Sequence, residues 1–192
     1  MNMIEICTVG GYNEVGRNCT AIKIDNEVII MDLGIHLENY IRYTEDDDMK
    51  SISEEKLVEV DAVPDLSVIE DWKKLVVAVV PTHAHLDHIG GIPYLAHNFD
   101  APIISTPFSN NVLRTILKDE KMSLKNDIID INSNSIYPVS ENIKIEFVNM
   151  THSTPQTSMV AIHTKYGVII YANDFKLDNF PTLGKKPNYK RM

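Results

Sequence analysis

The chain has 192 residues, of which 44% are hydrophobic and 23% are charged. This length and composition are typical of one soluble globular domain with a sizeable core, and they exclude disordered, collagen-like and coiled-coil proteins. The formal net charge of −9 argues against nucleic-acid binding through overall charge alone, although metal ions can supply a positive field locally.

The cysteine content and the N-terminus indicate the compartment. Cys7 and Cys19 are too few for a disulfide framework, and we expect both to be small buried apolar residues in a reducing compartment. The first eleven residues carry Glu5 and lack a basic flank, so they do not resemble a signal peptide. The longest strongly apolar run, 75–80, is too short to cross a bilayer. We therefore expect a cytoplasmic protein with no membrane partner.

Short apolar runs predict a protein built mostly of strands. Residues 4–9 alternate as a strand does, and strands at 20–25 and 28–32 are expected to be joined by a turn at Asp25-Asn26. The run 75–80 is apolar throughout, which predicts a strand buried on both faces. Further strands are expected at 103–105, 143–149, 159–164 and 168–172, with a turn at 165–167.

Two helices are expected. Thr106 and Pro107 are typical of an N-cap and a first helical position, and they predict a helix that continues to about Lys121. A second helix is expected over 89–98, despite two glycines and a proline near its start. Since the strands and helices do not alternate strictly, we expect sheets packed on one another with helices outside, an α/β (α+β) fold.

Two segments are expected to lie outside the strands and helices. The acidic run 45–48 is interpreted as a solvated loop. The last stretch, 180–192, combines prolines and a glycine with four basic residues, and it is interpreted as a basic connection. We therefore place a boundary between a domain of residues 1–179 and this connection.

Most of the functional information lies in Thr82-His83-Ala84-His85-Leu86-Asp87-His88, directly after the buried strand. His83 and His85 are two residues apart, so in an extended chain they project on one side and can hold one ion. Asp87 and His88 lie where the chain turns into a helix and can point together at a second ion. Imidazole and carboxylate ligands suit zinc, with manganese and iron as alternatives. A polar loop rich in histidine is the structural alternative, and it is disfavoured because buried polar groups need partners.

Two other strand ends can complete a metal site. His152 follows the strand that ends near Asn149; alone it would be interpreted as a surface or core histidine, but beside the first segment it is expected to be a ligand. Asp174 follows the strand that ends at Ala172, and a carboxylate there can bridge two ions about 3.5–4 Å apart. The alternative for Asp174 is a helix N-cap or a turn residue.

Asp32 closes another apolar strand. It is expected to accept a hydrogen bond from a ligating imidazole and so to fix the tautomer of that ring. A turn aspartate is the alternative. His36, His97 and His163 are interpreted as ordinary structural or surface residues.

These segments together resemble the metallo-β-lactamase superfamily. Residues 83–88 fit its HxHxDH signature, and His152 and Asp174 follow in the expected order. The more detailed similarity is to the β-CASP nuclease branch, and within it to the ribonuclease J family of archaeal type. That similarity covers essentially the whole chain and rests on residues 9–18, 31–34, 63–65, 152–153 and 173–176.

The resemblance implies a fold and a metal site. The implied fold is a metallo-β-lactamase αββα sandwich, incomplete at the C-terminus. One zinc ion would be held by His83, His85 and His152, and the other by Asp87 and His88, with Asp174 bridging the two. Manganese is the alternative metal.

The resemblance also implies an activity. The family hydrolyses RNA phosphodiesters as 5′-to-3′ exonucleases with some endonuclease activity, so the implied partner is 5′-monophosphorylated RNA, and the intact enzyme would be a homodimer. Two ions would activate water for in-line attack on phosphorus. Asp87 would orient that water as the catalytic residue, and Ser153 would contact the substrate. No donor of a proton to the leaving 3′ oxygen is identified.

The sequence departs from the family pattern in three ways. The family takes a further second-site histidine from near the end of the domain, and no histidine follows His163 here. The inserted β-CASP domain is absent, and Asn173 stands where glycine is usual. We therefore expect an N-terminal part of such an enzyme that binds zinc but is weakly active or inactive alone.

Two alternatives stay open. The HxHxDH signature is shared with superfamily hydrolases of other substrates, such as thioesterases and lactonases. A non-catalytic metal-binding half that needs a second chain to supply the missing histidine is the other alternative.

Overall fold

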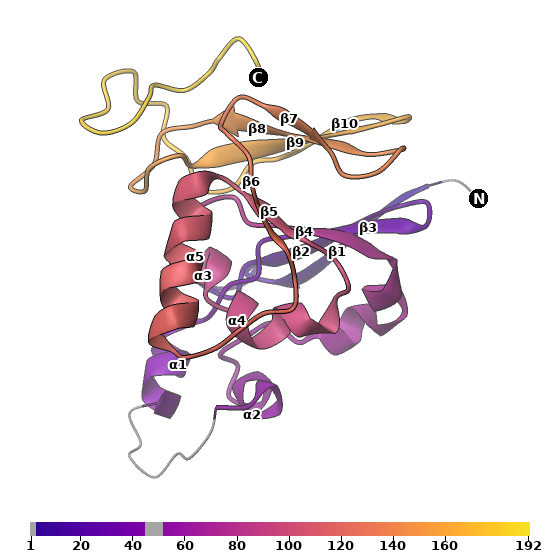
Figure 1. The fold of residues 1–192 in the computed structure, drawn as a ribbon, viewed down its shortest axis with the longest axis vertical. Helices are drawn as coiled ribbons and strands as arrows, with labels where there is room; N and C mark the ends of the chain where they lie inside the picture. The colour runs from indigo at the N-terminus through magenta and orange to yellow at the C-terminus, as the bar shows by residue number, and fades with distance from the viewer. Residues whose placement is uncertain (1–2, 45–51) are drawn as a thin grey trace.

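The computed structural model describes residues 3–44 and 52–192 (Figure 1). In these ranges, two β-sheets pack face to face, and the helices cover the outer face of the larger sheet (Figure 1). The fold is therefore a mixed α/β sandwich, as predicted. The acidic run 45–48 lies outside the described residues.

The larger sheet has six strands in chain order. They are β1 Ile4–Gly10, β2 Cys19–Ile24, β3 Glu27–Met31, β4 Val76–Val80, β5 Ile103–Ser105 and β6 Ile128–Asp130. β1 to β3 are antiparallel, and β3 to β6 are parallel. The parallel strands therefore all end at the same edge, and β4 is buried on both faces as its apolar run predicts.

The smaller sheet is antiparallel, in the order β10-β9-β8-β7. Its strands are β7 Ile136–Pro138, β8 Lys144–Asn149, β9 Ser158–Thr164 and β10 Gly167–Tyr171. Apolar side chains of both sheets meet in one core, in which Phe147, Ile29 and Met31 are among the largest fully buried residues. A second core lies between the larger sheet and the helices.

The helical segments are short except for α5. They are α1 Leu37–Thr44, α2 Glu54–Glu59, the 3₁₀ segment η1 Leu66–Leu75, α3 Leu86–Ile89, α4 Ile92–Leu95, the 3₁₀ segment η2 Ala96–Asn98 and α5 Pro107–Asp119. No helix in the described part of the chain is long and apolar enough to cross a membrane. Likewise, the described residues place no helix on the outer face of the smaller sheet, so three layers of the expected αββα sandwich are present.

The single helix predicted over 89–98 is wrong. The chain forms α3, α4 and η2 there instead, with breaks at Gly90-Gly91 and at Ala96. Gly91 lies against the backbone of the β3 end: a Cβ atom on it would be 2.7 Å from the carbonyl oxygen of Gly34. The close packing of Gly91 on this backbone, rather than helix propensity, therefore determines the conformation of the chain here.

Other predictions differ in detail. Thr106 occupies the N-cap of α5, but its side chain caps no backbone N–H and instead bonds to the Ser109 hydroxyl at 3.1 Å. Leu75 ends η1 rather than beginning β4. Cys19 is buried as expected, whereas Cys7 is only partly buried, and both thiols are free. The short elements α1, α2, β6 and β7 had too few residues to show a period in the sequence.

The C-terminal stretch has little regular structure, but it is tied to the smaller sheet. The side-chain amide of Asn149 donates to the carbonyl oxygens of Lys185 and Lys186 at 3.1 Å. Arg191 Nε lies 2.6 Å from Oε1 of the buried Glu146 on β8. The segment 180–192 therefore lies along this sheet, and the boundary after residue 179 stays a prediction.

Candidate metal centre

Loops that follow β3, β4, β8 and β10 meet at one edge of the sandwich and bring the predicted ligands together. In the first group, His83, His85, His152 and Asp174 each offer a donor atom within 4.8 Å of the others. His85 Nδ1 lies 2.9 Å from His83 Nε2 and 3.2 Å from His152 Nε2. Three ring nitrogens therefore face one point. The two-residue spacing of His83 and His85 predicts this arrangement for their two rings.

A second group lies beside the first. Asp87, His88 and Asp174 also offer donor atoms within 4.8 Å of one another. His88 Nε2 is 3.5 Å from Asp87 Oδ2 and 3.8 Å from Asp174 Oδ2. Asp174 belongs to both groups, and its side chain is half exposed, whereas His83 and His88 are buried.

The donor atoms suit a transition metal. Tetrahedral zinc with bonds of 2.0–2.1 Å places its nitrogen ligands about 3.3 Å apart. The 2.9 and 3.2 Å separations around His85 Nδ1 are close to that value. Imidazole and carboxylate donors without thiolate are consistent with zinc, manganese or iron. The cluster is therefore capable of binding metal.

Asp32 lies behind the second group. Its side chain is fully buried, its Oδ2 accepts from His88 Nδ1 at 2.8 Å, and its Oδ1 accepts from Thr82 N and Thr82 Oγ1, both at 2.8 Å. Because a carboxylate only accepts hydrogen bonds, Nδ1 of His88 carries a proton, and in the neutral ring the lone pair of Nε2 faces the second group. Asp32 also has a positive φ of 58°, so it is a turn residue as well.

Two residues near the start of the chain hold the Asp87 turn in place. Asn18 donates through its backbone N and its Nδ2 to the Asp87 carbonyl oxygen, at 3.1 and 2.9 Å. Its Nδ2 also lies 3.2 Å from both Asp87 Oδ2 and His88 Nε2. Gly34 packs so tightly that a Cβ atom on it would lie 1.6 Å from the Asp87 carbonyl oxygen.

Sequence reasoning did not predict that Asn18 contacts the metal-ligand groups. Its position at the end of a glycine-rich segment between two strands was the one feature that could have indicated this. Asn173 was noted only as a departure from the family pattern, yet its amide nitrogen lies 2.9 Å from His83 Nδ1. The predicted substrate residue Ser153 has its hydroxyl 3.1 Å from His85 Nε2, on the ring edge opposite Nδ1.

Burial and charge shift the histidines in opposite directions. Burial, reinforced by the neighbouring His88, His85 and His152, lowers the pKa of His83 to about 2. Burial and the nearby His85 also lower the pKa of His152. Burial acts to lower the pKa of His88, but the Asp32 charge and hydrogen bond outweigh it and the pKa is raised. His83 is therefore neutral at physiological pH, the form in which imidazole binds metal.

The remaining histidines lie outside both groups. His36 Nδ1 accepts from the Asn39 backbone N–H, His97 pairs with Glu54 at 3.1 Å, and His163 pairs with Glu146 at 3.0 Å. These are structural contacts.

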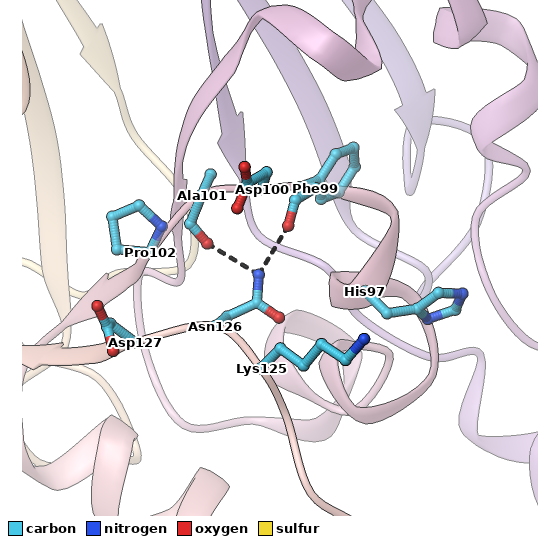
Figure 2. Close-up of a pocket in the computed structure, with 8 residues that line it drawn as sticks. All are labelled: His97, Phe99, Asp100, Ala101, Pro102, Lys125, Asn126 and Asp127. Atoms are coloured by element: carbon cyan, nitrogen blue, oxygen red, sulfur yellow. Dashed lines mark hydrogen bonds between the residues drawn. The ribbon is translucent and has the colours of Figure 1, made fainter.

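A pocket of about 340 Å³ lies at the opposite edge of the larger sheet, before β5 and β6 (Figure 2). The side-chain amide of Asn126 donates to the carbonyl oxygens of Phe99 and Ala101 at 2.9 and 2.8 Å and so joins two loops there (Figure 2). The metal-ligand groups lie at the carboxyl ends of the strands, so this pocket is separate from them.

Comparison with known proteins identifies the class. The family model described as "Metallo-beta-lactamase superfamily" matches residues 12–188, and the chain belongs to that superfamily. Among its relatives, Ribonuclease J of Methanocaldococcus jannaschii is 42% identical over 98% of this chain, and Ribonuclease J of Pyrococcus abyssi is 42% identical over all of it. Each alignment covers 42% of the relative, so the chain spans less than half the length of these curated proteins.

Solved structures support the fold. A protein of unknown function from Enterococcus faecalis matches 92% of this chain and 44% of its own with a TM-score of 0.67 at 19% identity. A metallo-β-lactamase from Cronobacter sakazakii with an HARLDQ motif matches 92% of this chain and 64% of its own, with a TM-score of 0.58 at 14% identity. Identities this low show the fold alone.

Proposed function

We propose that this chain carries the dinuclear zinc centre of an RNA phosphodiester hydrolase of the ribonuclease J type. One observation carries the proposal: two ligand groups share Asp174 at the strand ends of a chain that is 42% identical to Ribonuclease J over nearly its whole length. His83, His85 and His152 would hold one ion, Asp87 and His88 the other, and Asp174 both. Manganese is the alternative metal.

The residues divide the chemistry among themselves. When bound, two divalent ions supply Lewis acidity and lower the pKa of a coordinated water. Asn18 and Gly34 hold the Asp87 turn, which supports a role for its carboxylate in orienting the attacking water as well as in binding metal. The Ser153 hydroxyl lies on the exposed side of the cluster, where it can contact a substrate phosphate or hold His85.

The likeness to Ribonuclease J also motivates the choice of substrate and setting. We propose 5′-monophosphorylated RNA as the partner, exonucleolytic action from the 5′ end with some endonucleolytic cleavage, and action in the cytoplasm. The intact enzyme is proposed to be a homodimer. Because the chain spans 42% of these relatives, we expect this chain alone to be weakly active or inactive.

The first test is the metal content per chain, measured by mass spectrometry on purified protein. We expect two zinc ions, falling in His85→Ala but not in the matched control His97→Ala, whose ring lies outside both groups. One ion would show that the second site needs a further ligand. No metal in a folded chain would overturn the dinuclear centre.

The second test is a substrate panel of 5′-monophosphorylated RNA, esters and thioesters. Slow RNA cleavage that disappears in Asp174→Ala, with ester and thioester hydrolysis absent, would support the nuclease. Ester or thioester turnover that is lost in the same variant would replace the nuclease with a hydrolase of another substrate. Unchanged RNA cleavage in Asp174→Ala would overturn the shared role of this carboxylate.

A further inference from the structure

The ring of His83 is contacted on both of its nitrogens. Nε2 points into the first ligand group and lies 2.9 Å from His85 Nδ1. Nδ1 points the other way, toward the Asn173 amide nitrogen at 2.9 Å and the Thr82 hydroxyl at 3.2 Å. If metal binds at Nε2, the neutral ring must carry its proton on Nδ1, and that proton needs an acceptor on this side.

Thr82 is the weaker candidate for that acceptor. Its hydroxyl donates to Asp32 Oδ1 at 2.8 Å and accepts from the Asn173 amide nitrogen at 2.5 Å, which leaves it one lone pair, 3.2 Å from His83 Nδ1. The Asn173 amide is closer to His83 Nδ1 than the hydroxyl is, and it can present either an oxygen or an NH₂ group.

The two ends of the Asn173 amide favour different tautomers of His83. In the structure the NH₂ group faces Nδ1, which then accepts, so the ring proton lies on Nε2 and is donated to His85 Nδ1. This is a consistent metal-free arrangement, but it blocks Nε2. Oδ1 of Asn173 is buried and has no hydrogen-bond partner among the described residues, so a half-turn of the amide breaks no bond of Oδ1 and exchanges only the two contacts of the NH₂ group, with Thr82 Oγ1 and His83 Nδ1.

We propose that Asn173 is a positioning residue that sets the tautomer of His83. A half-turn of its amide places Oδ1 where it accepts Nδ1–H, and the lone pair of Nε2 is then free for metal. The ring stays neutral throughout, since its proton moves from Nε2 to Nδ1 by exchange with solvent. After the turn the Thr82 hydroxyl can donate to Asn173 Oδ1, while Asp32 Oδ1 keeps the Thr82 backbone N–H. This inference rests on the proposed metal centre.

Asn173 is a departure of this chain from the family pattern, in which glycine is usual at this position. Its backbone φ is not positive, so alanine can adopt the same conformation. Removal of the side chain therefore tests the amide itself.

The experiment compares the zinc affinity of Asn173→Ala, Asn173→Asp and the wild-type chain by competition with a chromophoric chelator. We expect Asn173→Ala to bind zinc about 10- to 100-fold more weakly, as is usual when the partner of a ligating imidazole is removed. Asn173→Asp should retain most of the affinity, because both carboxylate oxygens accept. The control Asn142→Ala removes an amide that contacts Glu27, far from the site, and should change nothing.

A second readout is the ¹⁵N NMR signature of His83. We expect the Nε2–H tautomer in the metal-free wild type and the Nδ1–H tautomer after zinc is added. Equal zinc affinity of Asn173→Ala and wild type, or equal weakness of Asn173→Ala and Asn173→Asp, would overturn the role of Asn173. If the wild type binds zinc no better than His85→Ala, the metal centre itself is wrong, which is a separate result.

Discussion

At the scale of single residues, the site depends on backbone packing as much as on its ligands. The Asp87 turn lies directly against Gly34, which follows β3, and Asn18 holds the same carbonyl oxygen from the end of the β1–β2 connection. The ligand motif after β4 is therefore positioned by two segments that contribute no ligand. A substitution in either segment should disturb the metal groups without removing a donor atom.

Gly34→Ala should be severely destabilising. Its Cβ atom would lie 1.6 Å from the carbonyl oxygen of Asp87 and 2.0 Å from the carbonyl carbon, and neither backbone atom can move aside alone. We expect a loss of about 3 kcal/mol or more in the free energy of unfolding, measured by urea denaturation. Gly184→Ala is the control: it has open space around its Cβ position and should cost only the smaller penalty of its positive φ. Equal stability of the two variants would refute the argument.

Asp32→Asn should destabilise the metal-free chain and weaken zinc binding. Both oxygens of Asp32 face donors, so an NH₂ group in place of either one meets an N–H or O–H group in a fully buried position. We expect a cost of about 1–3 kcal/mol in the free energy of unfolding, measured by urea denaturation in chelator. The exposed Asp71→Asn should have little effect. Wild-type stability in Asp32→Asn would mean that His88 does not depend on this carboxylate.

At the scale of elements, the strands were largely predictable and the short helices were not. Period-two alternation and the apolar run of β4 predicted eight of the strands to within one or two residues. The 89–98 segment failed because close packing on Gly34 breaks the helix at Gly91, a constraint that depends on tertiary contacts. The ligands of both groups were predictable because each follows a strand. The Asn173 and Thr82 contacts were not, since they join segments far apart in the chain.

The contact between the C-terminal segment and β8 should depend on pH. The Arg191 hydrogen bond, with His163, lowers the pKa of the buried Glu146 carboxyl below its ordinary value. A lowered pKa in the folded state stabilises the protein above the ordinary value near 4.5, and this stability is lost as the pH falls through the folded-state pKa.

Arg191→Ala should therefore reduce the free energy of unfolding at pH 7 only modestly, because solvent screens the half-exposed Arg191 side chain. The difference from wild type should shrink as the pH falls below about 4. Urea denaturation across this pH range checks both statements, with Lys190→Ala as the control. A difference that does not change with pH would show that the contact acts through packing alone.

At the scale of the whole molecule, the ligands come from both sheets. His83, His85, Asp87 and His88 follow β4 of the larger sheet, whereas His152 and Asp174 follow β8 and β10 of the smaller one. An ion held by both sets would join the two layers at one edge. The interior between the layers is apolar, so this joint would add to the hydrophobic core rather than replace it.

Zinc should therefore raise the thermal unfolding midpoint of the wild-type chain. At a free zinc concentration 100-fold above the dissociation constant, one site adds about 2.7 kcal/mol to the free energy of unfolding. Differential scanning calorimetry with zinc and then with excess chelator measures the shift. The shift should be much smaller in His85→Ala and unchanged in His97→Ala. A wild-type midpoint that does not respond to zinc would contradict the joining of the two sheets.

The spacing of the ligands along the chain also has a consequence for biosynthesis. Both groups include Asp174, and the first group begins at His83. A nascent chain on the ribosome thus exposes the histidine-rich segment long before either group can be completed. All strands of the larger sheet are synthesised before Asp174 is, but neither set of ligands is complete until then. Metal capture by the complete groups therefore follows the synthesis of β10, when the strands of both sheets have already been made.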